Sequence, residues 1–145
     1  MNRDYPERPF IGVGVAVLRA DAVLLIRRGK APRRGQWSLP GGLQEVGETV
    51  FEAARREVRE ETAVEIDDLA VVDVIDSIQR DAAGAVEFHY TLVDLAARWT
   101  GGEAVAGSDA MHAEWIPFAR IDGLGMWSET NRVIREGRRL LFADG

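Results

Sequence analysis

Three glutamates near residue 60 are the side chains of this sequence best suited to chemistry. Glu57, Glu60 and Glu61 lie in a stretch from Thr49 to Thr62 that contains no glycine or proline and therefore predicts a helix. A helix turns by about 100° per residue, so the three carboxylates share one face. Like charges at this spacing repel, and a cation would turn the repulsion into binding. Oxygen ligands of this kind suit Mg²⁺, with Mn²⁺ as a substitute.

A second interpretation of the same residues needs no metal. Acidic runs on helices are commonly solvated surface, and Arg55, Arg56 and Arg59 would then be ordinary ion-pair partners of the glutamates. The clustering of the three acids does not by itself decide between a metal site and a solvated helix face.

The spacing of a longer segment favours the metal site. Gly42, five further residues, Glu48, seven further residues and then Arg56 to Glu61 (REVREE) resemble the Nudix box, the signature of a family of Mg²⁺-dependent nucleotide pyrophosphohydrolases. Every fixed polar position of that pattern is filled. One position departs from it, because Ala63 replaces the glycine that normally closes the helix in a left-handed conformation. This replacement costs stability but removes no ligand.

The resemblance also implies roles for the residues of the box. Glu57, Glu60 and Glu61 would bind the metal together with the backbone carbonyl of Gly41, the first glycine of the pair. Glu48 and Arg56 match positions that brace the loop against the helix, and Glu48 is in some members a metal ligand through water. We count these five side chains as the candidate catalytic set. The carboxylate that acts as general base varies within the family.

A further acid in such proteins often comes from the loop ahead of a segment like Glu114 to Pro117 (EWIP). Asp109 is placed like that acid and is a candidate metal ligand. A plain loop-capping role for Asp109 fits its position equally well. The glycines between Thr100 and Asp109 predict a mobile loop that closes on bound nucleotide.

The candidate substrate-binding residues lie outside the box. An aromatic side chain can stack on a nucleobase, and Phe10, Tyr90 and Trp127 are candidates for that role. The amide of Asn131 is a candidate for reading a base edge. Arg27, at the end of a strand and just before a basic loop, is placed to hold phosphates. Each of these residues also fits a role in the core, in a helix cap or in solvent.

Composition limits the class of protein. The length of 145 residues predicts one domain, residues 1–145, with room for a core. The absence of cysteine excludes disulfides and thiol catalysis and is compatible with the cytoplasm, where we place the protein. The net charge of −6 argues against coating of nucleic acids, and no apolar run is long enough to span a membrane. The expected partner is a small nucleotide, and a homodimer is compatible with the resemblance.

Alternating and periodic residues predict the elements that position these side chains. The expected strands cover residues 10–18, 22–28, 37–39, 69–79, 86–99 and 114–118, and the expected helices cover residues 49–62 and 128–141. Within the helices, Phe51, Ala54 and Val58 share one face, while Ser128 is the expected cap of the second helix and Leu140 one of its buried residues. The order of the elements predicts an α/β (α+β) fold, and the resemblance implies an α/β/α sandwich with a mixed sheet between helices.

These features predict a Mg²⁺-dependent hydrolase of a pyrophosphate bond in a nucleoside diphosphate linked to another group. The resemblance favours ADP-ribose or a related nucleotide sugar as substrate. The first alternative is a (deoxy)nucleoside triphosphate, including oxidised guanine nucleotides. An alternative of another class is a non-catalytic module that senses nucleotides.

Overall fold

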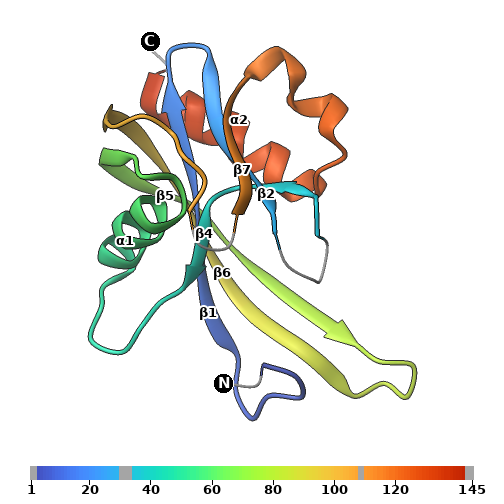
Figure 1. The fold of residues 1–145 in the computed structure, drawn as a ribbon. Coiled ribbons are helices and arrows are strands. Elements are labelled where there is room, and N and C mark those ends of the chain that lie inside the picture. The colour runs from blue at the N-terminus through green and yellow to red at the C-terminus, as the bar shows by residue number, and fades with distance from the viewer. Residues whose placement is uncertain (1–2, 30–33, 108–109, 143–145) are drawn as a thin grey trace.

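The structure is a computed structural model that describes residues 3–29, 34–107 and 110–142. Figure 1 shows a twisted sheet with one helix on each side and a long hairpin extending from the body. The elements are, in chain order, β1 (Phe10–Arg19), β2 (Ala22–Arg28), β3 (Trp37–Ser38), β4 (Gly41–Leu43), α1 (Val50–Thr62), β5 (Glu65–Arg80), β6 (Val86–Gly101), β7 (Ala110–Pro117), the 3-10 helix η1 (Phe118–Leu124) and α2 (Ser128–Phe142).

The sheet is mixed, as predicted. Its main order is β3-β2-β1-β6-β5, with β1 and β6 parallel and the other neighbours antiparallel. Two further strands join beside this path, since β4 pairs with β1 and β7 pairs with β2. One edge of β1 is therefore divided: its C-terminal half pairs with β2, and its N-terminal half pairs with β4.

Alternate residues of each strand serve two separate cores, because successive side chains of a strand point to opposite faces. Val13, Val15 and Val17 of β1 pack with α1, whereas Ala16 and Leu18 pack on the other face with α2. We call these the α1 face and the α2 face. The sandwich that the sequence predicted is confirmed.

The glycine pair is the main point on which the predicted elements are wrong. The expected strands end at residue 39 and resume at residue 69, yet Gly41 and Gly42 belong to β4 and pair with Val13 and Gly14. The reason is steric: a Cβ on Gly41 would lie 2.0 Å from the carbonyl oxygen of Val13. Only glycine allows the two backbones to approach this closely.

The start and the end of α1 are both set by local chemistry. The Thr49 side chain accepts from the backbone N–H of Glu52 at 3.0 Å, and the Glu52 side chain accepts from the backbone N–H of Thr49 at 2.8 Å. This reciprocal pair is a capping box. At the other end, Ala63 has φ 62° and ψ 17° and is left-handed, as the resemblance to the box predicted.

We therefore expect Ala63→Gly to raise the free energy of unfolding by about 1 kcal/mol, since glycine adopts a left-handed conformation without the steric cost of a Cβ. Urea unfolding at neutral pH would measure the change. Ala53→Gly is the matched control, because Ala53 is buried inside the same helix and glycine there destabilises by about 1 kcal/mol. A loss of stability in Ala63→Gly would contradict the role given to this position.

Other differences concern boundaries and burial. β5 begins four residues before the predicted Leu69, β7 begins four residues before Glu114, and η1 was not predicted. Ser128 is the first residue of α2 rather than its cap. The backbone N–H groups of Thr130 and Asn131 donate to the carbonyl of Trp127. Phe51 and Leu140 are exposed, so the buried faces of both helices are narrower than the apolar residues indicated. No helix in the described part of the chain could span a membrane.

Candidate functional site

The acidic helix meets the glycine pair along the free edge of β4. Val15 N–H donates to the Pro40 carbonyl and Gln44 N–H donates to the Ile11 carbonyl. In an antiparallel ladder this pattern directs the N–H and C=O groups of Gly41 and Leu43 away from β1. Gly41 N–H accordingly donates to Glu61 Oε1 at 2.6 Å, and the Leu43 carbonyl accepts from Arg56 Nη2 at 2.9 Å.

The same ladder places the carbonyl of Gly41 on this edge, between the two bonds that attach α1. The predicted backbone ligand therefore lies beside Glu61, at a place that we call the β4–α1 junction (Gly41 to Leu43 with Glu48, Arg56, Glu57 and Glu61).

Arg56 connects the groups of this junction. Its Nε donates to Glu48 Oε2 at 2.5 Å, its Nη1 donates to Glu57 Oε1 at 2.7 Å, and its Nη2 reaches the carbonyl of Leu43. The hydrogen bond from Arg56 lowers the pKa of Glu48 to about 2, and Glu48 in turn raises the pKa of Arg56. Glu48 also accepts from the N–H of Glu45 at 2.9 Å. Through these contacts Arg56 joins Glu48 and the carbonyl of Leu43 to α1.

Glu57 is partly buried and in close contact with its neighbours. Its side chain is 14% exposed, and its carboxylate lies so close to Gly42 that a Cβ there would be 2.5 Å from an Oε atom. Burial raises the pKa of Glu57, and the neighbouring Arg56 partly offsets that rise. The second glycine of the pair is therefore required by the carboxylate, just as the first is required by β1.

The three metal-ligand candidates differ in their environment. Glu61 is 7% exposed and bonded to Gly41, whereas the Glu60 side chain is 52% exposed, 3.4 Å from Arg56 Nη1. In the part of the chain that the structure describes, no three acidic or histidine side chains stand together as a ready metal-binding group. A cation would compete with Arg56 for Glu57 and with Gly41 N–H for Glu61. The donors themselves, carboxylates and a backbone carbonyl, fit a hard cation such as Mg²⁺.

The loop predicted to be a mobile lid is attached to α1 over its described part. Val105 N–H donates to the carbonyl of Thr62, and Gly107 N–H donates to that of Glu61 at 2.7 Å. A Cβ on Gly107 would lie 1.9 Å from the carbonyl oxygen of Glu60. Asp109, the candidate further acid, lies outside the described residues, and its role stays a prediction.

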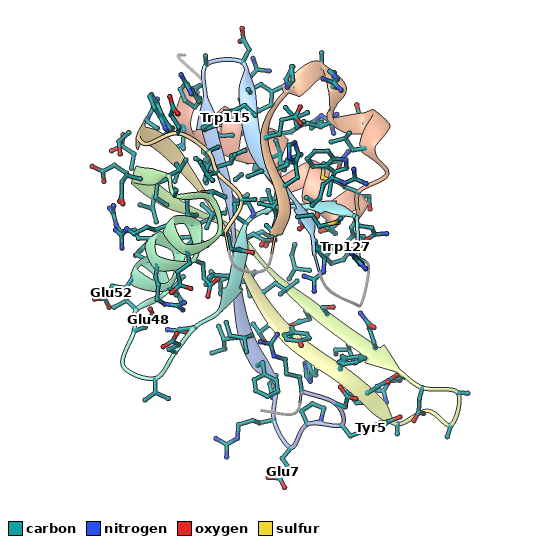
Figure 2. The ribbon with its side chains drawn as sticks, in the orientation of Figure 1. Tyr5, Glu7, Glu48, Glu52, Trp115 and Trp127 are labelled. Atoms are coloured by element: carbon teal, nitrogen blue, oxygen red, sulfur yellow. The ribbon has the colours of Figure 1, made fainter. Side chains whose placement is uncertain are left out.

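The candidate substrate residues do not join the β4–α1 junction. Phe10 and Tyr90 are register partners on β1 and β6, with ring centroids 6.1 Å apart. Their positions alternate with Val13 and Val15, so they lie on the α2 face. Trp127 is 47% exposed just before α2, and Figure 2 shows it on the opposite side of the molecule from Glu48. Asn131 donates through Nδ2 to Asp122 at 3.1 Å, and its Oδ1 is buried without a partner among the described residues.

Arg27 is directed elsewhere by its own contacts. Its Nε donates to the carbonyl of Gly35 at 3.0 Å, and its guanidinium lies 5.4 Å from the ring centroid of Trp37. The side chain is exposed on β2. A role in holding phosphates stays a prediction for this residue.

Asp94 is a chemically distinctive residue that the sequence analysis missed. It lies on β6 between Gly14 of β1 and Asp73 of β5 and is 8% exposed, and its side chain makes no hydrogen bond or ion pair with any described residue. Burial, with a contribution from Asp73, raises the pKa of Asp94 to about 6. The sequence does contain a signal for this residue. In an alternating strand, Asp94 is the one acid in the otherwise non-acidic series Tyr90, Leu92, Asp94, Ala96, which faces one side of the sheet.

The pKa of Asp94 gives a pH dependence of stability whose sign is fixed. A carboxyl with a raised native pKa favours folding below its unfolded pKa near 3.8, and this contribution is lost as the pH rises through about 6. Asp94→Asn removes the titration, so the stability of the variant relative to wild type should increase between pH 4 and pH 7.5, by about 3 kcal/mol at most. Thermal unfolding of both proteins at the two pH values would measure this. An unchanged difference would contradict the burial of the charge.

The comparisons with known proteins agree with this geometry. The family model described as NUDIX domain matches residues 8–136. An ADP-ribose pyrophosphatase of Methanocaldococcus jannaschii is 34% identical over 90% of this chain and 74% of its own length. An 8-oxo-dGDP phosphatase of Mus musculus is 32% identical over 74% of this chain, which spans only 32% of that relative.

A solved structure extends the likeness to three dimensions. The crystal structure of a MutT NUDIX hydrolase from Burkholderia pseudomallei superimposes with a TM-score of 0.76 at 28% identity, covering 90% of this chain and 98% of that one. The match of the family model to most of the chain, on a fold that brings Glu48, Arg56 and two acids of the box to one junction, means that this protein belongs to the NUDIX hydrolase family.

Proposed function

We propose that this protein hydrolyses the pyrophosphate bond of a nucleoside diphosphate linked to a second group, with ADP-ribose as the favoured substrate and Mg²⁺ as cofactor. The observation that carries the proposal is the β4–α1 junction, where Glu61 and Glu57 are fixed against the two glycines of β4. A solvated acidic helix face would not need its carboxylates bonded to a strand edge.

The protein's own groups would divide the work as follows. Arg56 holds Glu57 and Glu48 in place, and Gly41 N–H orients Glu61. Glu57, Glu60, Glu61 and the carbonyl of Gly41 would hold the metal. A bound divalent cation neutralises phosphate charge and lowers the pKa of a coordinated water. In the reaction the water oxygen bonds to phosphorus, the bridging P–O bond breaks, and a carboxylate of the junction takes the proton of the water.

The preference for ADP-ribose rests on relatives. The relative from Methanocaldococcus jannaschii is described as an ADP-ribose pyrophosphatase and is aligned over most of both chains. The alternative substrate, an oxidised guanine nucleotide, is supported by the mouse relative, but this chain spans only about a third of that protein. Of the two likenesses, the first covers more of this chain and much more of its relative.

A panel of nucleotides with Mg²⁺ and product identification tests this proposal. ADP-ribose should give AMP and ribose 5-phosphate, and hydrolysis should stop with EDTA and return with Mg²⁺ or Mn²⁺. If 8-oxo-dGDP or a triphosphate released a nucleoside monophosphate and ADP-ribose gave no product, the alternative substrate would be favoured. Binding of ADP-ribose without any product would favour the nucleotide-sensing module, and hydrolysis that persisted after exhaustive chelation would refute the role of the metal.

A further inference from the structure

Asp94 lies at the inner end of a solvent-accessible, largely apolar surface on the α2 face. β1 contributes Phe10, Gly12 and Gly14 to this surface, and β6 contributes the register partners Tyr90, Leu92 and Asp94. Phe10, Tyr90, Leu92 and Gly14 are partly exposed, whereas Gly12 is buried, as are Ala16 and Ala96, which follow on the same face. We call these six residues the Asp94 surface.

Because Gly14 has no side chain, it leaves room for the carboxyl of Asp94. A Cβ at residue 14 would lie 2.7 Å from Asp94 Oδ1 and 3.6 Å from the Leu39 side chain. The carboxyl therefore covers the bare backbone of Gly14, beside the half-buried Leu92. A buried carboxyl without a hydrogen-bond partner costs free energy unless a ligand or water satisfies it.

The first turns of α2 lie next to this surface. Gly137 packs against Ala96, Arg98 donates to the carbonyl of Leu141, and Arg132 bonds Asp73, the cross-strand partner of Asp94. The helix therefore runs alongside β6 in the same direction. Four helical residues advance about as far as two strand residues. Val133 is then level with Asp94, and the start of α2, with the half-exposed Trp127 before it, is near Leu92.

The surface is also close to the β4–α1 junction. Gly14, under the Asp94 carboxyl, is the register partner of Gly41, whose N–H bonds Glu61. One pair of strand residues thus separates the two sites. An aromatic and aliphatic surface with a single buried acceptor at its end suits a flat, largely apolar group that carries an N–H donor.

We propose that Asp94 recognises the exocyclic amino group of the purine in the nucleotide that this protein binds, while the apolar part of the Asp94 surface packs against the ring. The proposal rests on the proposed function only in taking the ligand to be a nucleotide. Asp73, Arg132 and Glu129 are the charged groups beside Asp94, and all three are engaged with one another. The carboxylate oxygens of Asp94 are therefore available to accept a hydrogen bond from the ligand.

Equilibrium binding of nucleoside monophosphates tests this without requiring turnover. AMP is compared with purine riboside 5′-monophosphate, and GMP is compared with IMP, since each second compound lacks the exocyclic amino group of the first. We expect wild-type protein to bind AMP or GMP roughly tenfold or more tightly than its counterpart, the range for a hydrogen bond to a charged group. Asp94→Leu should abolish this difference, leaving affinity for the compounds without the amino group within about twofold.

Asp73→Leu is the matched control, because Asp73 lies on the same face of the neighbouring strand but is 40% exposed and paired with Arg132. It should keep the preference for the amino group. Asp94→Asn, which preserves shape, should weaken the preference and guards against misfolding of the leucine variant. Equal preference in wild type and Asp94→Asn, or no preference in wild type, would overturn the proposal. If the preference for the amino group depended on Asp94 but the protein hydrolysed no nucleotide, the role of Asp94 would be upheld and the proposed function refuted.

Discussion

Glu57→Gln and Glu61→Gln are each expected to lower turnover of the pyrophosphate substrate by several orders of magnitude while leaving the fold intact. Glutamine keeps the size of the side chain, and its oxygen can still accept from Arg56 or from Gly41 N–H, the partners seen for these two residues. What it loses is the negative charge that the proposed cation would bind. Most of the rate enhancement in such hydrolysis comes from stabilising charge on the phosphates.

The measurement is steady-state turnover with saturating Mg²⁺, with thermal unfolding as a check on the fold. Glu52→Gln is the matched control on the same helix, because Glu52 serves the capping box, which glutamine can also form. It should retain near-normal turnover. A reduction below about tenfold in Glu57→Gln or Glu61→Gln, equivalent to about 1.4 kcal/mol, would refute the assignment.

Arg56→Lys is expected to cost both stability and activity. One guanidinium bonds Glu48, Glu57 and the Leu43 carbonyl, and a lysine ammonium cannot make these three contacts at once. Glu57 and Glu48 would be left partly buried with weakened partners. We expect the free energy of unfolding to fall by about 2–4 kcal/mol and turnover to fall by roughly tenfold or more, as the loop moves away from the helix.

Arg59→Lys supplies the comparison for this prediction. Arg59 is on the same helix and also pairs with a glutamate, Glu65, but both side chains are about half exposed. An exposed pair of this kind contributes up to about 1 kcal/mol. Urea unfolding and turnover of the two variants would therefore differ clearly. Equal effects of Arg56→Lys and Arg59→Lys would mean that the contacts of Arg56 do not hold the junction together.

The sequence predicted those elements that a local pattern of residues marks. β1 and β2 alternate between two cores, and their observed bounds agree with the prediction to within one residue. α1 is marked by Thr49 and by the absence of glycine and proline, and it begins and ends where expected. The left-handed Ala63 followed from the resemblance to the Nudix box, because that position is normally glycine.

The features that were missed depend on contacts between distant segments. β4 consists mainly of glycine, which has little strand preference of its own, and it exists because β1 offers Gly12 and Gly14 opposite it. Phe51 has the right helical spacing for burial, yet it is 44% exposed. Asp94 became notable only when its burial, its missing partners and its position over Gly14 were known together.

The acids of α1 are proposed to hold a divalent cation against a bound pyrophosphate. Titration of Mn²⁺ followed by electron paramagnetic resonance, in the presence of an α,β-methylene analogue of ADP-ribose, tests this claim without turnover. Wild-type protein should bind Mn²⁺ stoichiometrically, and the double variant Glu57→Gln with Glu61→Gln should bind it roughly a hundredfold more weakly or worse. Equal Mn²⁺ affinity in the two proteins would contradict the claim.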